Sequence, residues 1–325
     1  MASSNTTLKN EKKQHSFRVI IRLVIGILLV AFLIWNVRIE KLFQSLSQIS
    51  IPYFFLAISY QYTSIFLGSF NQYILFTAFS NLSYKTYFFA YFKAYAIGLL
   101  LPGQIGDASI ALFLKSEGLY YSQTLSVYIM DKFLTFLLYV SALIIFIGDI
   151  TGYSAIFSLS FLIVFSCLMS IMFYIFVKLA SSFPVAWQKN RLLRFIHNTS
   201  SQLIFFAKHH PFLLLINFLL TFLKLGLVMF CYHAMLTALD YNLSVWKVGL
   251  AALASGIVGY IPVSIQGLGT VEAVALLNFK ILGVSPPDVL VCYLLLRSNN
   301  YILACLAYAV TFLSKKNQSA ERIAV

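Results

Sequence analysis

The sequence predicts an all-α polytopic membrane protein, with about six full transmembrane helices plus two re-entrant helical hairpins arranged as an inverted repeat. Of its 325 residues, 60% are hydrophobic and only 10% are charged, whereas a soluble domain carries about 25% charged residues. The mean hydropathy is +0.86. The apolar residues also gather in runs of membrane-spanning length, and two further pairs of runs are shorter and interrupted by Pro and Gly.

Six apolar runs reach the roughly 20 residues that a helix needs to cross about 30 Å of hydrocarbon. In chain order they are 19–37, 52–79, 124–147, 154–177, 213–236 and 289–313. A basic segment precedes the first run, as in a signal peptide, but charged residues rather than a small-residue cleavage site follow it. We therefore expect this run to be retained as a transmembrane helix.

Two pairs of apolar runs are interrupted before they reach the length of a span. They are 87–101 with 107–114, around a break at Pro102–Gly106, and 248–261 with 270–282, around a break at Pro262–Gly269. Irregular backbone at membrane depth survives only where protein or a wet cavity surrounds it. Each pair is therefore predicted to form a re-entrant hairpin; the alternative is two tilted spans joined by a short loop.

The basic residues predict the orientation of the chain. Most of the 23 Lys and Arg residues lie in the tails, the connector and the loops near Lys85 and Lys115, which the positive-inside rule assigns to the cytoplasm. We expect a multi-pass protein of the cell (cytoplasmic) membrane with both termini cytoplasmic. The predicted domains are a cytoplasmic basic tail (1–18), a single transmembrane domain (19–314, with halves at about 51–177 and 211–314 and a basic connector at 178–210) and a cytoplasmic tail (315–325).

In this topology the first hairpin enters from the cytoplasm and the second from outside. Asp107 precedes Asp131 by 24 residues, and Glu272 precedes Arg297 by 25. Paired interruptions in two halves are typical of inverted-repeat transporters with a site near the midplane of the membrane. Chance similarity between two Gly-broken apolar segments is the alternative.

The candidate substrate-binding residues lie at the two breaks and at charges within the spans. Glycine lets the backbone expose N–H groups, and the dipole of a helix N-terminus favours an anion. The acidic residues there either cap a helix or bind a headgroup amine, a proton or a cation. Intramembrane charges are functional candidates because inserting them is costly. The candidates are Gly103, Gln104, Gly106, Asp107, Asp131, Gln266, Gly267, Gly269, Glu272 and Arg297.

Arg297 is expected to pair with Glu272 or Asp107; a structural ion pair is the alternative to a functional one. Lys93, Lys132 and Lys224 are weaker intramembrane candidates. The connector is predicted either to form an amphipathic surface helix or to remain a solvated basic loop.

Several function classes have no support in the sequence. We find no P-loop, HExxH, GxSxG or zinc pattern, and the four cysteines lack metal-ligand spacing. We predict no catalytic residues, no cofactor, no metal site and no enzymatic activity. The formal net charge of +13 suits anionic lipid headgroups rather than nucleic acid, because the basic residues lie beside membrane spans.

Two motifs carry a resemblance to a known family. Leu101–Asp107, followed by Met130–Phe133, resembles the first signature of the lysylphosphatidylglycerol synthase transmembrane family, and Pro262–Ala273 resembles its second. The resemblance extends over about residues 19–314. It implies a flippase-like membrane domain, here a stand-alone member, that moves a phospholipid or a lipid-linked intermediate.

The chain also departs from the family pattern. The family often has arginine where Gln104 stands, glutamate where Asp107 stands, and arginine near Ile110 and Val271. The loss of these positive groups argues against an identical anionic headgroup. The soluble aminoacyl-transfer domain of fused members has no counterpart, so lysyl transfer is not predicted.

The predicted partners are membrane lipids of the anionic phospholipid or polyprenyl-phosphate type, with a separate lipid-modifying enzyme as a further candidate. The leading hypothesis is lipid translocation. The alternatives are a membrane-embedded transferase acting on a lipid-linked sugar or phospholipid, and an accessory subunit that positions an enzyme. A transferase needs a catalytic acid at the membrane surface, and Asp149 and Asp240 have no second acid nearby. The oligomeric state is not predicted.

Overall fold

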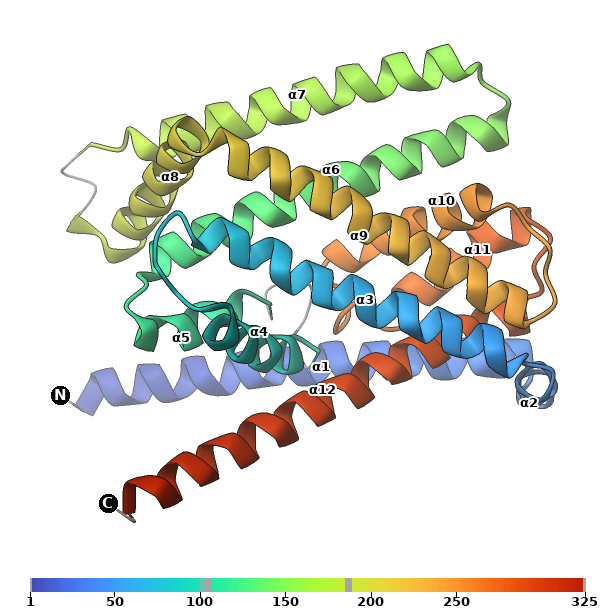
Figure 1. Ribbon diagram of the computed structural model, residues 1–325, viewed down its shortest axis with the longest axis horizontal. Helices are drawn as coiled ribbons and strands as arrows, with labels where there is room; N and C mark the ends of the chain where they lie inside the picture. Colours follow the sequence, from blue (N-terminus) through green and yellow to red (C-terminus); the bar gives the residue numbers. More distant parts are fainter. Residues whose placement is uncertain (1, 100, 102–106, 185–188, 324–325) are drawn as a thin grey trace.

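The computed structural model describes residues 2–99, 101, 107–184 and 189–323. These residues form helices and connecting turns, with no β-strand among them. Figure 1 shows the long helices running in roughly one direction, as expected for a bundle that spans a membrane. The elements are α1 (Ala2–Val37), α2 (Ile39–Ser47), α3 (Ile51–Phe76), α4 (Tyr84–Gly98), η2 (Asp107–Ser109), α5 (Ile110–Leu114), η3 (Lys115–Glu117), α6 (Tyr121–Thr151), α7 (Ala155–Ser181), α8 (Arg191–His209), α9 (Pro211–Ala238), α10 (Val245–Gly256), η5 (Ile257–Tyr260), α11 (Thr270–Ile281) and α12 (Pro286–Ile323).

The six predicted spans all fall on helices of this bundle. Among the described residues, five helical segments are long and apolar enough to cross a membrane: Ile20–Val37 of α1, α6, α7, α9 and Pro286–Ala309 of α12. A sixth candidate is the pair α2 and α3, which is bent by 97° at its break. The sequence analysis predicted α3 but not the short helix α2. The chain is therefore a multi-pass, all-helical membrane protein.

The packing separates helices of the periphery from helices of the core. In the most apolar 18-residue stretch of α7 no residue is buried, and Figure 1 shows this helix at one edge of the bundle. An exposed apolar helix of this length is stable only against lipid. In contrast, α3 packs along α9, while α10 packs against both α6 and α9. These central helices, together with α12, surround the site.

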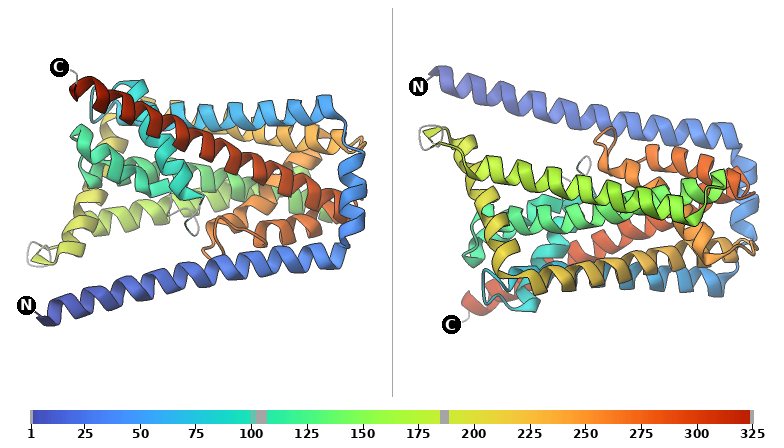
Figure 2. Two further views of the ribbon diagram at one scale, coloured as in Figure 1. Left: turned by 90° about the horizontal axis from the view of Figure 1, so that it is seen from below. Right: turned by 90° about the horizontal axis from the view of Figure 1, so that it is seen from above.

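Both termini lie at the same end of the molecule as α8, which runs across the bundle (Figures 1 and 2). The Asn190 side chain caps α8 by accepting a hydrogen bond from the Leu192 N–H at 2.8 Å. Most of the basic connector is therefore a surface helix, which was one of the two predicted forms. That both termini face the cytoplasm stays a prediction.

The two broken pairs differ in how much the structure describes. In the second pair, α10 and η5 lead into residues 261–269, and α11 then packs back against α10. In the first pair, α4 packs against η2 and α5, while the break at 102–106 lies outside the described residues. In both pairs the helices are shorter than a span. The re-entrant hairpins and the inverted repeat stay predictions.

Candidate functional site

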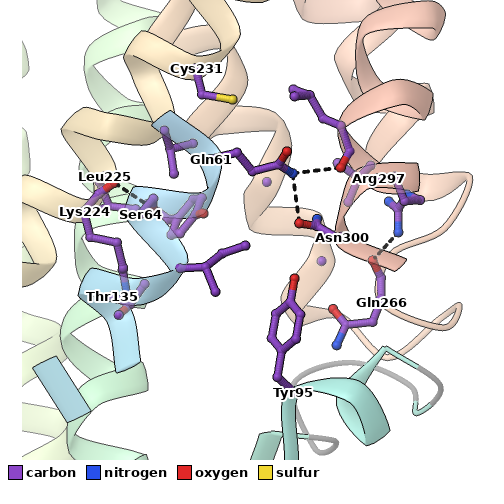
Figure 3. A pocket seen from close by; sticks show the side chains of 18 of the residues that line it. Gln61, Ser64, Tyr95, Thr135, Lys224, Leu225, Cys231, Gln266, Arg297 and Asn300 are labelled. Atoms are coloured by element: carbon purple, nitrogen blue, oxygen red, sulfur yellow. Dashed lines mark hydrogen bonds between the residues drawn. The ribbon is translucent and has the colours of Figure 1, made fainter. Parts of the chain in front are cut away.

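A cavity of about 380 Å³ lies inside the helix bundle. Its lining comes from α3, α4, α6, α9, α11, α12 and the turn around η5. Lys224 stands half-way along α9, and Arg297 stands half-way along the apolar segment Pro286–Ala309 of α12. Because the spans cross the hydrocarbon, the cavity lies near their mid-depth. Figure 3 shows side chains from opposite walls pointing into it.

An ion pair between Glu272 and Arg297 forms one wall. The Arg297 Nε donates to Glu272 Oε1 at 2.7 Å, and Arg297 Nη2 lies 2.6 Å from the same oxygen. Glu272 is 1% exposed. Its second oxygen, Oε2, accepts the Gly269 N–H at 2.7 Å at the start of α11. Glu272 is therefore both the cap of α11 and a partner of Arg297, as predicted. The side chain of the other predicted partner, Asp107, lies outside the described residues.

Gln266 joins the second break to the end of α4. Its backbone carbonyl accepts a hydrogen bond from Arg297 Nη1 at 3.2 Å. Its side-chain Nε2 donates to the carbonyl of Gly98 at 2.8 Å. Gly98 is the last residue of α4 and lies just before the first break. The two interrupted segments are 168 residues apart in sequence at this contact, yet they meet at the same cavity.

A second buried polar cluster surrounds Asp131 on α6. The carboxylate is 2% exposed. It accepts hydrogen bonds from Gln72 Nε2 at 2.9 Å and from Asn217 Nδ2 at 3.1 Å. The Tyr87 hydroxyl donates to Gln72 Oε1 at 3.0 Å, which fixes the orientation of that amide. The charges of Lys224 and Lys132 act on the same carboxylate. Asp131 is thus stabilised inside the membrane by amides and by cations.

The remaining walls are rich in amides and tyrosines. Gln61 Nε2 on α3 donates to the Leu296 carbonyl at 2.7 Å and to Asn300 Oδ1 at 2.9 Å, both on α12 (Figure 3). On the facing wall, the Ser64 hydroxyl donates to the Lys224 carbonyl at 3.2 Å. The tyrosines of the lining are Tyr91, Tyr95, Tyr139, Tyr232, Tyr260 and Tyr293. The cavity therefore presents hydroxyl, amide and charged groups in a chain that is otherwise apolar.

Four of the ten predicted site residues line this cavity: Asp131, Gln266, Glu272 and Arg297. The other predicted residues have different places. Gly267 and Gly269 shape the turn before α11, with φ values of +69° and +79°. The predicted residues Gly103, Gln104 and Gly106 lie outside the described residues, and Asp107 begins η2 without a described side chain.

The sequence analysis left several lining residues out of the predicted site. It identified Lys132 and Lys224 as intramembrane charges, and these could have been included on that ground alone. Gln61 and Gln72 gave a weaker signal, since isolated amides also occur in ordinary spans. What distinguishes them is their contacts with α12 and α6, which only the packing creates.

Gly269 fixes the turn against α1, and substituting it is expected to be destabilising. A Cβ at Gly269 would lie 2.4 Å from Leu29 Cβ and 3.1 Å from the Gly26 carbonyl oxygen. The positive φ adds strain of about 1–2 kcal/mol for any other residue, and the overlap adds about 1–3 kcal/mol. We expect Gly269→Ala to lower the free energy of unfolding by at least about 2 kcal/mol, measured by denaturant titration in detergent micelles.

Gly283→Ala is the matched control for this experiment. Gly283 has a φ of +80°, but an added Cβ there would meet nothing within 4 Å. Its substitution therefore reports the backbone strain without the clash. Equal losses of stability in the two variants would contradict the proposed close contact between α1 and the turn.

Comparison with known protein families places the chain in one of them. A family model described as "Lysylphosphatidylglycerol synthase TM region" matches residues 19–307, which is nearly the whole chain. The match contains five of the six candidate spans, all but the last two residues of the sixth (Pro286–Ala309), both interrupted segments and the cavity. No curated protein matches the chain.

Proposed function

From the premise that the chain belongs to the lysylphosphatidylglycerol synthase transmembrane family, we propose that it is a membrane lipid translocator. In this proposal it moves a phospholipid or a lipid-linked intermediate between leaflets and does no chemistry on the lipid. The observation that carries the proposal is the polar cavity at mid-depth of the spans. A headgroup crossing the bilayer needs such an environment, because each unsatisfied polar group costs several kcal/mol in hydrocarbon.

The size of the cavity supports this role. Small-molecule sites in proteins have volumes of about 300–1,000 Å³, and the cavity holds about 380 Å³. This volume accommodates a headgroup but not a whole lipid. The acyl or polyprenyl chains would therefore stay in the surrounding hydrocarbon while the headgroup passes through the protein.

The chemical lining supports the same role. Charged side chains inside a membrane are costly and mark the pathways of polar substrates. Five of them meet here: Asp131, Lys132, Lys224, Glu272 and Arg297. A purely structural ion pair would account for Glu272 with Arg297, but it would not require a cavity beside that pair or a second charged cluster on the opposite wall.

Reconstitution tests the proposal. The purified full-length protein is placed in phosphatidylcholine vesicles that contain trace lipids labelled on their acyl or polyprenyl chain. A membrane-impermeant reductant then quenches the label in the outer leaflet. For at least one lipid, we expect the reductant to quench more label than the outer leaflet holds, because labelled lipid moves out from the inner leaflet. Protein-free vesicles and vesicles with an unrelated helical membrane protein should lose only the label of the outer leaflet.

Two outcomes would contradict translocation. One is that no lipid of a panel spanning phospholipids and polyprenyl phosphates moves faster than in the protein-free vesicles. The other is that the inert protein co-purifies with a lipid-modifying enzyme whose activity depends on it, which would indicate the accessory role instead. Formation of a product from a polyprenyl-phosphate sugar by the purified chain would indicate a transferase.

A further inference from the structure

The charges and acceptors of the cavity select among headgroups, and this inference rests on the translocation proposed above. Two carboxylates, Asp131 and Glu272, face three cations, Lys132, Lys224 and Arg297. The described part of the lining therefore carries a formal charge of +1. At membrane depth a net charge is poorly screened, so a ligand with one negative charge is favoured over a neutral or cationic one.

Both carboxylates already accept hydrogen bonds from protein groups. Glu272 binds Arg297 and the Gly269 N–H. Asp131 accepts from Gln72 and Asn217. An ammonium group would have to displace one of these donors and would also add a second positive charge to the cavity. The lining therefore disfavours amine-bearing headgroups.

The amides and tyrosines select for hydroxyl groups. Gln61 uses its Nε2 for two hydrogen bonds to α12, which fixes the orientation of its amide. Its Oε1 is buried without a partner among the residues that the structure describes. This oxygen needs a donor, and an ionised phosphodiester has none to offer. A hydroxyl supplies that donor without adding charge.

The tyrosine side chains of the lining also suit a ligand that carries hydroxyl groups. Tyr95 points its hydroxyl into the cavity toward Asn300, below Gln61 (Figure 3). A tyrosine side chain combines an apolar ring face with a hydroxyl that both donates and accepts. A polyol or a sugar has the same combination of C–H groups and hydroxyls. A bare phosphomonoester has no C–H groups to pack on the ring faces.

We propose that the headgroup is a phosphodiester with one negative charge that carries a polyol or a sugar, and that it does not carry an amine. The phosphodiester lies with the Lys224 ammonium, and the hydroxyls lie with Gln61, Asn300 and the tyrosines. Two kinds of lipid have this chemistry: a phospholipid with a polyol headgroup and a polyprenol linked to a sugar through a phosphodiester.

A headgroup panel tests this inference in the vesicle assay. The labelled probes are phosphatidylglycerol, a glycosyl phosphoryl polyprenol, phosphatidylethanolamine, phosphatidic acid and lysyl-phosphatidylglycerol. We expect at least one of the first two to move at least about tenfold faster than the last three, the factor that one charge-assisted hydrogen bond provides. Whichever of phosphatidylglycerol and the glycosyl lipid moves faster shows whether the headgroup carries a polyol or a sugar.

Two variants test the assigned roles. Lys224→Met should reduce the preference for anionic over amine-bearing lipids by about tenfold, because it removes a cation and keeps most of the length of the side chain. Gln61→Leu should reduce the preference for hydroxyl-bearing lipids over phosphatidic acid. Lys85→Met and Gln44→Leu, at exposed positions away from the cavity, are the matched controls and should leave both preferences unchanged.

The outcomes separate this inference from the proposed function. Equal rates for all headgroups, or a preference for an amine-bearing lipid, would overturn the headgroup inference and leave translocation standing. If no lipid moves, native mass spectrometry of the purified protein with the same probes measures which headgroups it binds. Selective retention of phosphatidylglycerol or the glycosyl lipid would support the headgroup inference alone, and unselective retention would overturn it.

Discussion

Replacing Arg297 with methionine is expected to lower the free energy of unfolding by about 3–5 kcal/mol, the usual result of removing one partner from a buried ion pair. The cause is the carboxylate that remains. Glu272 is 1% exposed, and among the described residues it would keep the Gly269 N–H as its hydrogen-bond donor, since both short contacts to its Oε1 come from Arg297. Denaturant titration of the full-length protein in detergent micelles measures the change.

A double variant identifies the origin of this loss. In Glu272→Gln with Arg297→Met, the side chain at 272 keeps an oxygen that accepts the Gly269 N–H, but it carries no charge. We expect the double variant to regain a substantial part of the stability lost in Arg297→Met, because replacing a whole buried pair is far cheaper than breaking it. Arg194→Met, at an exposed position of α8, is the control and should change stability by less than about 0.5 kcal/mol. Additive losses in the double variant would argue against the ion pair.

The second large effect is expected at Asp131. In Asp131→Asn one carboxylate oxygen becomes an amide nitrogen, so either the Gln72 or the Asn217 amide loses its acceptor. Hydrogen bonds to charged groups contribute about 1.5–3 kcal/mol, and a buried donor without a partner adds a penalty of similar size. We expect a loss of about 2–3 kcal/mol in the same titration.

Asp149→Asn is the matched control for Asp131. Asp149 lies on the same helix, near its end, and is exposed. Its substitution should change the free energy of unfolding by less than about 0.5 kcal/mol. If the two variants were equally stable, the amide cluster around Asp131 would not hold an ionised carboxylate, and the count of charges in the cavity would have to be revised.

The sequence by itself determined the spans and the place of the polar site along the chain. Bilayer thickness sets a minimum length for an apolar helix, and the six runs that meet it are the helices or the bent pair seen in the structure. Inserting charge in the membrane is costly, so the isolated charges at Asp131, Glu272 and Arg297 already pointed to an internal site. These inferences need only local properties of the chain.

The tertiary structure decided which of these residues meet. Sequence spacing left Arg297 with two candidate partners, Asp107 and Glu272, because either acid begins the second arm of an interrupted segment. The turn at Gly269 orients Glu272 toward α12, where it pairs with Arg297. Likewise, Gln61, Lys224 and Arg297 come from three different helices, and no periodicity in one helix reveals its neighbours in space.

The physical reason is the solvent. In water, the apolar stripe of a helix marks the face that packs against protein. In a bilayer the lipid-facing surface is as apolar as the protein-facing one, so helix association depends on the fit of small residues and on buried hydrogen bonds. The contact of Gly269 with α1 and the bond between Gln266 and Gly98 are of this kind. The cavity is formed by such contacts, and it therefore becomes visible only once the helices are packed.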